Sequence, residues 1–352
     1  MIPTIYIVTP CLNMRGSIDR TILSVATQAG DFRIRHHVKD GGSDDGTVER
    51  LRWWRQRLAS RAFPIQCRGV DFTYSSEADI GMYDALIQGY SQMEPSANDW
   101  LTWINADDIL MPGALAFASN VDRQFAPNQL SWFGGSVNIL KDDATVIGYD
   151  RAIPTELVRA GLCDSIHWNF VQQEGTFYRK WLWDSARPEE NIRSMKVAGD
   201  WNLWHLFAQK ASFVQHLQPL AGFRIREGQL SAKHRDLYHA EMDAVVPAEQ
   251  RRKMLEELGA RGGVLRRKFK VRVSDGVLSI LEENRDKLLA YHYHKVFGKY
   301  PPAKAKDVAD RVVFTGDLGL SGADQLPSVE SVATHQDGIF SYDRDWQFPA
   351  IT

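Results

Sequence analysis

Residues 100–108 read Trp-Leu-Thr-Trp-Ile-Asn-Ala-Asp-Asp, an apolar run that ends abruptly in two adjacent carboxylates. The apolar part predicts a buried strand over 100–104, so Asp107 and Asp108 are expected at the edge of a sheet. Clustered carboxylates repel one another and lose hydration, so a chain normally tolerates them only where a cation or hydrogen-bond donors compensate. The pattern favours a metal site over its alternative, a turn that opens a helix near Pro112.

The composition is that of an ordinary folded protein. The chain has 352 residues, of which 44% are hydrophobic and 24% charged, and its formal net charge is −2. That length suits one large domain plus an extension, and the small net charge gives no general attraction to nucleic acid, which is not an expected partner. Three cysteines are too few and too scattered for a disulfide framework. No signal-peptide pattern or membrane-length apolar run is found, so we expect a cytoplasmic protein.

The first hundred residues alternate between β-rich runs and segments with helical periodicity. Strands are expected at 4–9, 34–39, 72–76 and 100–104, and helices at 17–28, 48–58 and 82–92. The alternation predicts an α/β fold with a largely parallel sheet flanked by helices. Loops that carry Asp follow the second, third and fourth strands. In a parallel sheet such loops gather at the carboxyl edge, so one site could collect all three.

The pattern weakens beyond residue 130. Strands are expected at 131–137, 145–149, 212–217 and 220–225, and helices at 155–160, 200–208, 248–258 and 277–293. The last stretch, from residue 316, is rich in Gly, Ser and Asp and is expected to be irregular.

Two of the polar loops carry carboxylates suited to a nucleotide. Asp40 ends the second strand, and Gly41 and Gly42 can take positive φ before a run able to expose backbone N–H groups. A carboxylate can accept from the ring N–H of uracil, so Asp40 is a candidate base reader, with a plain glycine turn as the alternative. Asp79, before the helix at 82–92, can face the same edge or cap that helix.

Seven segments together resemble the successive motifs of family 2 glycosyltransferases. They are residues 9–13, 40–47, 76–85, 105–108, 172–179, 199–204 and 223–231. Their order and spacing also match those of the family. The resemblance implies a glycosyltransferase-A fold, which is Rossmann-like with a mixed, mostly parallel sheet flanked by helices. It further implies a nucleotide-sugar donor, a divalent Mg²⁺ or Mn²⁺ ion and inversion at the anomeric carbon.

The resemblance also implies roles for individual residues. The nucleotide sugar is expected to contact Pro10, Asn13, Asp40, Gly41, Asp79, Asn105 and Ala106. Asp107 would be the metal-binding second acid of the Asp-x-Asp motif, with Asp108 beside it, and Asp200 matches the catalytic base. Asn105 departs from the family's usual first Asp, and Gly199 stands where the family often has Glu.

The chemistry of sugar transfer accounts for these residue types. A leaving diphosphate gains charge that a cation must neutralise, and Mg²⁺ or Mn²⁺ prefers carboxylate and phosphate oxygens, so Asp107 is the expected anchor. A carboxylate such as Asp200 can take the proton of the attacking hydroxyl, with a helix N-cap as its alternative role. Five tryptophans lie in the half expected to hold the acceptor: Trp168, Trp181, Trp183, Trp201 and Trp204. Most are expected in the core, and one or two of the five are expected to touch substrate.

We therefore predict an inverting, metal-dependent glycosyltransferase. It would move a hexose or N-acetylhexosamine from a UDP sugar to a glycan or lipid-linked acceptor in surface polysaccharide synthesis. One alternative is a noncatalytic nucleotide-sugar-binding module. The other is a Rossmann-type oxidoreductase, which the missing Gly-x-Gly-x-x-Gly pattern disfavours.

The chain is expected to divide into a catalytic domain and an extension. Residues 1–235 would form the glycosyltransferase-A domain, with 1–110 as its nucleotide-binding half and 111–235 as its acceptor half. Residues 236–352 would form a mainly helical extension and tail. The basic segment 266–272 could contact an anionic membrane at its inner face, with a solvated surface as the alternative.

Overall fold

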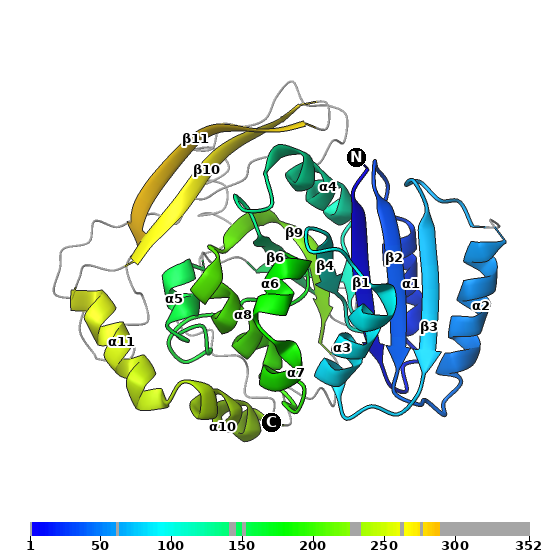
Figure 1. Ribbon diagram of the computed structural model, residues 1–352, viewed down its shortest axis with the longest axis horizontal. Coiled ribbons are helices and arrows are strands. Elements are labelled where there is room, and N and C mark those ends of the chain that lie inside the picture. Colours follow the sequence, from blue (N-terminus) through cyan, green and yellow to red (C-terminus); the bar gives the residue numbers. More distant parts are fainter. Residues whose placement is uncertain are drawn as a thin grey trace.

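In the computed structural model of the protein, the described residues are 2–60, 63–140, 146–149, 153–225, 234–260, 264–274 and 277–288. These residues form one nine-stranded sheet with helices on both faces, and a separate two-stranded hairpin (Figure 1). The architecture is mixed α/β, which confirms the predicted fold class. None of the described helices is long and apolar enough to cross a membrane.

The amino-terminal part of the sheet consists of parallel strands. They are β1 (Thr4–Cys11), β2 (Arg33–Asp40), β3 (Val70–Ser76) and β4 (Trp100–Trp103), in the spatial order β3-β2-β1-β4. The register pairs Cys11 with Asp40 and Asp40 with Ser76, so three strands end side by side. The strands predicted in this half are confirmed, and their Asp-bearing loops leave the sheet at one edge.

Beyond β4 the sheet becomes mixed. Continuing outward, the strands are β8 (Thr176–Arg179), β6 (Trp132–Leu140), β9 (Val214–Arg224) and β5 (Ile109–Leu110), and β7 (Val146–Tyr149) pairs with β6. The strands predicted at 212–217 and 220–225 are one strand, β9. Its pairing with β6 shifts register on both sides of the Ser136–Pro219 pair. Proline cannot donate a hydrogen bond to a neighbouring strand, so Pro219 predicts a break between two strands. In the structure the strand continues through it.

Helices cover both faces of this sheet (Figure 1). One face holds α3 (Met82–Met93), α5 (Thr155–Arg159), α6 (Lys180–Ser185), α7 (Pro188–Asn191) and α8 (Gly199–Lys210), and the other holds α1 (Ile18–Ala26), α2 (Thr47–Ala59) and α4 (Ala114–Gln124). Alternate side chains of β1 pack against the helices on opposite faces of the sheet. Tyr6 and Val8 pack with α3 and α8, whereas Ile5 and Ile7 pack with α1 and α4. A strand buried on both sides is mainly apolar, and the middle of β1 from Ile5 to Val8 follows this rule.

Stacked tryptophans tie α8 to the sheet. The Trp204 ring lies nearly parallel to the rings of Trp103, at 5.3 Å between centroids, and Trp132, at 5.7 Å. All three side chains are buried. Each such aromatic pair contributes about 0.5–1.5 kcal/mol beyond its buried area. The stacking fixes α8, and the first turn of α8 carries Asp200.

The carboxyl-terminal region contains helices and a hairpin. Two helices follow the sheet, α10 (Arg235–Val245) and α11 (Ala248–Ala260). Helix α11 confirms the helix predicted at 248–258. The helix predicted at 277–293 is wrong where the structure describes it: β11 (Val277–Leu288) pairs antiparallel with β10 (Val264–Ser274), which contains the segment 266–272. The register places Lys270 across from Glu282. Pairing with a second strand decides this conformation, and a local helical period does not reveal such a partner.

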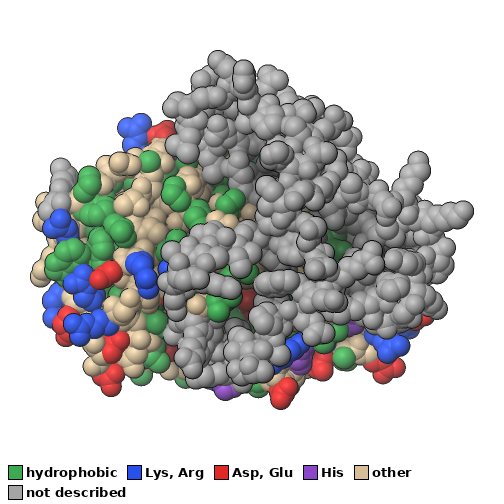
Figure 2. Space-filling view, turned by 180° about the vertical axis from the view of Figure 1, so that it is seen from behind, with side chains coloured by type: hydrophobic (Ala, Val, Ile, Leu, Met, Phe, Trp, Pro, Cys, Tyr) green, Lys and Arg blue, Asp and Glu red, His purple; other side chains and the backbone are tan. Residues whose placement is uncertain are grey.

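Charged side chains of both signs are interspersed on the described part of the face in Figure 2. Between α1 and α2, for example, Asp19 pairs with Arg50 at 2.8 Å, and Arg50 and Arg57 flank the exposed ring of Trp53. Exposed pairs of this kind contribute little to stability because water screens them. This surface is typical of a solvated region.

Candidate active site

Asp40 anchors the loop that follows β2. Its side chain is fully buried, and its carboxylate accepts from the backbone N–H groups of Gly42 at 3.1 Å and Ser43 at 2.9 Å. The hydroxyls of Ser43 and, at 2.6 Å, Ser76 donate to it as well. Gly42 has a φ of 93°, a conformation that favours glycine, so the loop can fold back onto the carboxylate. Asp40 therefore joins its own loop to the end of β3.

Asp79 lies directly against this loop. A Cβ atom at Gly41 would lie 3.0 Å from Oδ2 of Asp79, so the small residue permits the close approach. The Asp79 carboxylate accepts from Gly81 N–H at 3.0 Å and lies 3.8 Å from Nζ of the buried Lys39. Burial raises the pKa of Asp79, and the Gly81 N–H and the Lys39 ammonium oppose that rise. The structure brings Asp40 and Asp79 together as predicted, and adds a cation that the sequence analysis missed.

The loop after β1 completes this side of the site. Pro10 pairs with Lys39 in the sheet register, and Asn13 lies three residues further on with a φ of 53°. The Asn13 side-chain oxygen accepts from Asp44 N–H at 3.0 Å, and the backbone N–H of Asn13 donates to Ser43 Oγ at 2.7 Å. The loops after β1 and β2 are thereby held together at the sheet edge.

The loop after β4 brings Asp107 to the same edge. Asp107 is 7% exposed, and neighbouring Ala106 packs in the core beside Cys11. Burial raises the pKa of the Cys11 thiol, and the charges of Asp40 and Asp107 raise it further. Both carboxylates therefore lie close to one sulfur atom at the end of β1. The predicted convergence of acids from separate loops is present.

Asp108 has a different environment. It is 1% exposed, and its Oδ1 accepts from Arg224 N–H in β9 at 2.8 Å. No donor among the described residues reaches its Oδ2, Oε2 of the buried Glu174 or the side-chain oxygen of Asn105. Burial, then the charge of Glu174, raises the pKa of Asp108, and burial raises that of Glu174 to about 7. Two adjacent buried carboxyls are most stable when they share a proton or a cation.

Asp200 occupies the first turn of α8. Its Oδ1 accepts from the backbone N–H of Trp201 at 2.8 Å and from the hydroxyls of Tyr83 at 3.3 Å and Tyr238 at 3.4 Å. Burial raises the pKa of Asp200 to about 6, although these donors lower it. A carboxylate with such a pKa is ionised at neutral pH and is still basic enough to take a proton. The charge of Asp200 also raises the pKa of Glu174, and the charge of Glu174 raises that of Asp108.

Gly199 makes room for one of these donors. A Cβ atom at this position would lie 2.7 Å from the Tyr83 ring. The single O–H of Tyr83 is shared between Asp200 Oδ1, at 3.3 Å, and the carbonyl of Val197, at 3.1 Å, so the ring is held against the start of α8. Tyr83 thus occupies the space that a larger side chain at position 199 would need.

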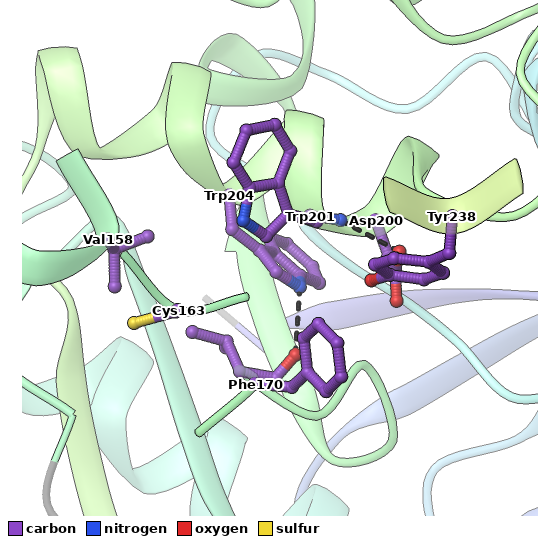
Figure 3. Close-up of a pocket in the computed structure, with 8 residues that line it drawn as sticks. Val158, Cys163, Phe170, Asp200, Trp201, Trp204 and Tyr238 are labelled. Atoms are coloured by element: carbon purple, nitrogen blue, oxygen red, sulfur yellow. Dashed lines mark hydrogen bonds between the residues drawn. The ribbon is translucent and has the colours of Figure 1, made fainter. Parts of the chain in front are cut away.

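A small cavity adjoins Asp200 (Figure 3). Trp201, Trp204, Phe170 and Tyr238 contribute aromatic walls, and about 10 Å³ is open to the centre of a water-sized molecule. That is room for about one water. The ring of Tyr238 lies next to the Asp200 carboxylate, and the indole of Trp204 donates to the main chain at Val171 (Figure 3). The buried Trp201 and Trp204 form part of the core as well as of this wall.

Comparison with known proteins finds a family match in the amino-terminal part of the chain. Residues 6–116 match the model of the family described as glycosyl transferase family 2. The match contains β1 to β4 and the acids at their ends, up to Asp108.

Two curated relatives carry the name of this class of enzyme. They are "Uncharacterized glycosyltransferase MT1564" and "Uncharacterized glycosyltransferase Rv1514c", both from Mycobacterium tuberculosis. Each is 31% identical to this chain over 106 residues, which is 30% of this chain. The chain spans 34% of the length of these relatives.

Solved glycosyltransferase structures show a weaker similarity. Staphylococcus aureus TarS 1–349 in complex with UDP-GlcNAc is 14% identical, with a TM-score of 0.49 over 73% of this chain and 72% of that chain. GalNAc-T7 with UDP, GalNAc and Mn²⁺ is 10% identical, with a TM-score of 0.47 over 74% and 51%. Both TM-scores are below 0.5, so neither similarity assigns a ligand to this chain.

The oxygen atoms of this candidate site fit a divalent ion that is shared with a ligand. The described residues contain no group of three or more acids, histidines or cysteines placed to hold a metal by themselves. Mg²⁺ commonly takes one or two carboxylates plus substrate phosphates, and Asp107 with its neighbours offers that smaller set. The unsatisfied buried oxygens of Asn105, Asp108 and Glu174 are all hard donors of the kind these ions prefer.

Proposed function

We infer that this protein is an inverting, metal-dependent glycosyltransferase. It transfers a hexose or N-acetylhexosamine from a UDP sugar to a glycan or lipid-linked glycan in surface polysaccharide synthesis. One observation carries the proposal: carboxylates from separate loops meet at the carboxyl edge of a family 2 domain, and one further carboxylate, Asp200, has its pKa raised to about 6.

The loops after β1, β2 and β3 form the nucleotide side. Asp40 and Asp79 supply acceptors for the uracil ring, and Gly41 keeps their loops in contact. Pro10 and Asn13 shape the wall after β1, while Asn105 and Ala106 face the ribose from the end of β4. The backbone bonds that Asp40 and Asn13 make within these loops support this assignment, because they preorganise the pocket before the ligand binds.

Asp107 is the proposed ligand of Mg²⁺ or Mn²⁺, with the diphosphate supplying further oxygens. A bound divalent ion would neutralise the charge that builds on the leaving diphosphate. Asp108 lies deeper, bonded to β9 and next to Glu174, so we assign it mainly to holding the loop and only secondarily to the ion.

Asp200 is the proposed catalytic base. The acceptor hydroxyl oxygen forms a bond to the anomeric carbon as the bond from that carbon to the diphosphate oxygen breaks. The electron pair of the broken bond leaves with the diphosphate, and the hydroxyl proton passes to Asp200. Attack opposite the leaving group inverts the anomeric centre, and general-base catalysis of this kind contributes about 10²–10⁴ in rate.

A donor panel tests this function. The full chain is incubated with Mn²⁺, a set of nucleotide sugars and candidate glycan acceptors, and the released nucleotide is measured by mass spectrometry. We expect UDP release from a UDP sugar, and we expect Asp200→Asn to lower turnover by about 10²-fold or more while donor affinity stays within about twofold. Donor binding without nucleotide release from any member of the panel would instead indicate a noncatalytic binding module.

A further inference from the structure

Helix α10 contacts the first turn of α8, although it lies beyond the segment expected to form the catalytic domain. Two of its side chains, Tyr238 and Glu241, are three residues apart, so they lie on one face of the helix. Tyr238 reaches the carboxylate of Asp200. Glu241 reaches the backbone just before it.

Glu241 holds the segment that leads into α8. Its carboxylate accepts from the backbone N–H groups of Lys196 at 2.7 Å, Val197 at 3.1 Å and Ala198 at 2.8 Å. These residues come directly before α8, and backbone donors that are shielded from water need an acceptor. Ala198, the residue at the N-cap position, has no side-chain acceptor to supply. The placement of the turn that carries Asp200 therefore depends on α10.

Two tyrosines hold Asp200 by the same oxygen. Tyr83 from α3 and Tyr238 from α10 both donate to Oδ1, as does the N–H of Trp201. In the described part of the chain these donors leave Oδ2 for the incoming proton. At 3.3 and 3.4 Å the two hydroxyl bonds are long, and catalytic hydrogen bonds often tighten only when substrate binds.

A buried ion network fixes α10 in this position. Arg251 of α11 is 1% exposed and pairs with Asp164 at 3.0 Å and with Asp243 of α10 at 2.8 Å. Its guanidinium also donates to the carbonyl of Val246 at 2.5 Å. Asp164 belongs to the loop after α5 and accepts from His167 at 2.7 Å. These ion pairs join helices α10 and α11 to the loop after α5. Cys163 of that loop lines the cavity beside Asp200.

We propose that Tyr238 and Glu241 are positioning residues for Asp200, and that α10 is part of the catalytic unit. Glu241 sets the first turn of α8, and Tyr238 orients the carboxylate so that Oδ2 meets the acceptor hydroxyl. The proposal rests on the function inferred for Asp200. It gives the region after residue 235 a part in the reaction, in place of the separate extension expected from the sequence.

The test compares steady-state kinetics of the full chain and its Tyr238→Phe variant. The substrate is UDP-N-acetylglucosamine or UDP-glucose, whichever releases UDP faster from the wild-type protein with Mn²⁺. We expect kcat to fall about tenfold or more, with the donor KM within about twofold. Tyr90→Phe is the matched control, because Tyr90 is a buried tyrosine bonded to Tyr178, away from Asp200, and it should leave kcat unchanged.

The pH profile separates positioning from a general structural effect. The groups that face Asp200 are the hydroxyls of Tyr83 and Tyr238, the Trp201 N–H and the carboxyl of Glu174. Removing one donor to the carboxylate raises its pKa, so the acid limb of kcat should move to higher pH in Tyr238→Phe. A variant that was only destabilised would lose activity without moving this limb.

Glu241 gives a second, independent readout. In Glu241→Ala we expect faster hydrogen exchange in a peptide spanning residues 195–203, together with lower kcat, because three backbone donors lose their acceptor. Glu241→Gln keeps one side-chain oxygen and should restore part of both. If Tyr238→Phe does not fold, the Glu241 variants alone test whether α10 positions Asp200.

The possible failures are distinguishable. If the wild-type protein releases no UDP with any donor and acceptor, the proposed function fails and this inference fails with it. If the wild type is active and Tyr238→Phe matches it in kcat and pH profile while Glu241→Ala leaves kcat and exchange unchanged, α10 has no positioning role and the proposed function stands.

Discussion

At the scale of single residues, the environment of each carboxylate sets what it can do. Asp40 is buried and accepts from four donors of its own loop and Ser76, so it holds the shape of a pocket. Asp200 has long bonds to two tyrosines and a pKa raised by burial to about 6. The same side chain therefore serves as an anchor in one place and as a base in another.

The raised pKa of Asp200 predicts the pH dependence of the reaction. Protonation removes the base, so kcat/KM should fall about tenfold per pH unit below about pH 6 and level off above it. The measurement is a kcat/KM profile from about pH 5 to about pH 8. Asp200→Asn should lack this acid limb. A wild-type profile that stays flat down to about pH 5 would contradict the assignment.

Gly199 predicts a steric effect on the same group. In Gly199→Ala the new Cβ would lie 2.7 Å from the Tyr83 ring, so the ring or α8 must shift. We expect a loss of about 1–3 kcal/mol in the free energy of unfolding, together with lower kcat. Gly16→Ala is the matched control, because nothing lies within 4 Å of a Cβ at that position. Equal urea midpoints for the two variants would argue against the packing described here.

At the scale of elements, α8 is held at two points. Stacking of Trp204 on Trp103 and Trp132 fixes its middle against the sheet, and Glu241 of α10 binds the backbone that leads into its start. Asp200 lies at that end of the helix. The precision of the site therefore depends on how firmly α10 and α11 are attached to the rest of the protein.

The Arg251 network predicts how strongly those helices are attached. Arg251→Ala leaves the carboxylate of Asp164, which is 0% exposed, without its main cation, and breaking a buried pair in this way costs about 3–5 kcal/mol. Arg187→Ala removes a cation from an exposed pair with Glu190 and should cost less than about 1 kcal/mol. Urea unfolding of both variants checks the difference. Similar midpoints would show that the network does not hold the helices in place.

At the scale of the whole molecule, local pattern was enough for the first half of the fold and not for the rest. Strands β1 to β4 and helices α1 to α3 follow their predicted ranges closely, because short β-rich runs that end in polar or glycine residues alternate with helices that have an apolar face. Strand β5 has two residues and β8 has four, too few for a period to show. Strand β11 owes its conformation to β10, a partner that local periodicity does not identify.

The residues of the candidate site also differ in whether local sequence could predict them. Asp40, Asp79, Asp107 and Asp200 could be predicted because each lies in a motif that resembles the family's. Lys39 reads as one residue of a strand, and its proximity to Asp79 comes only from folding. Glu174 lay inside a matching motif, so its acid was a signal that could have been followed. Tyr238 could not be found, because its role arises from contact with Asp200 across 38 residues.

The central claim is that these acids converge on a divalent ion and an activated sugar, and calorimetric titration of UDP into the protein tests it most directly. We expect UDP binding that is strengthened by Mn²⁺, and a loss of about tenfold or more of that Mn²⁺-dependent affinity in Asp107→Ala. Asp71→Ala serves as the control, because Asp71 is an exposed acid paired with Arg35 within the sheet. UDP affinity that is indifferent both to Mn²⁺ and to Asp107→Ala would contradict the account.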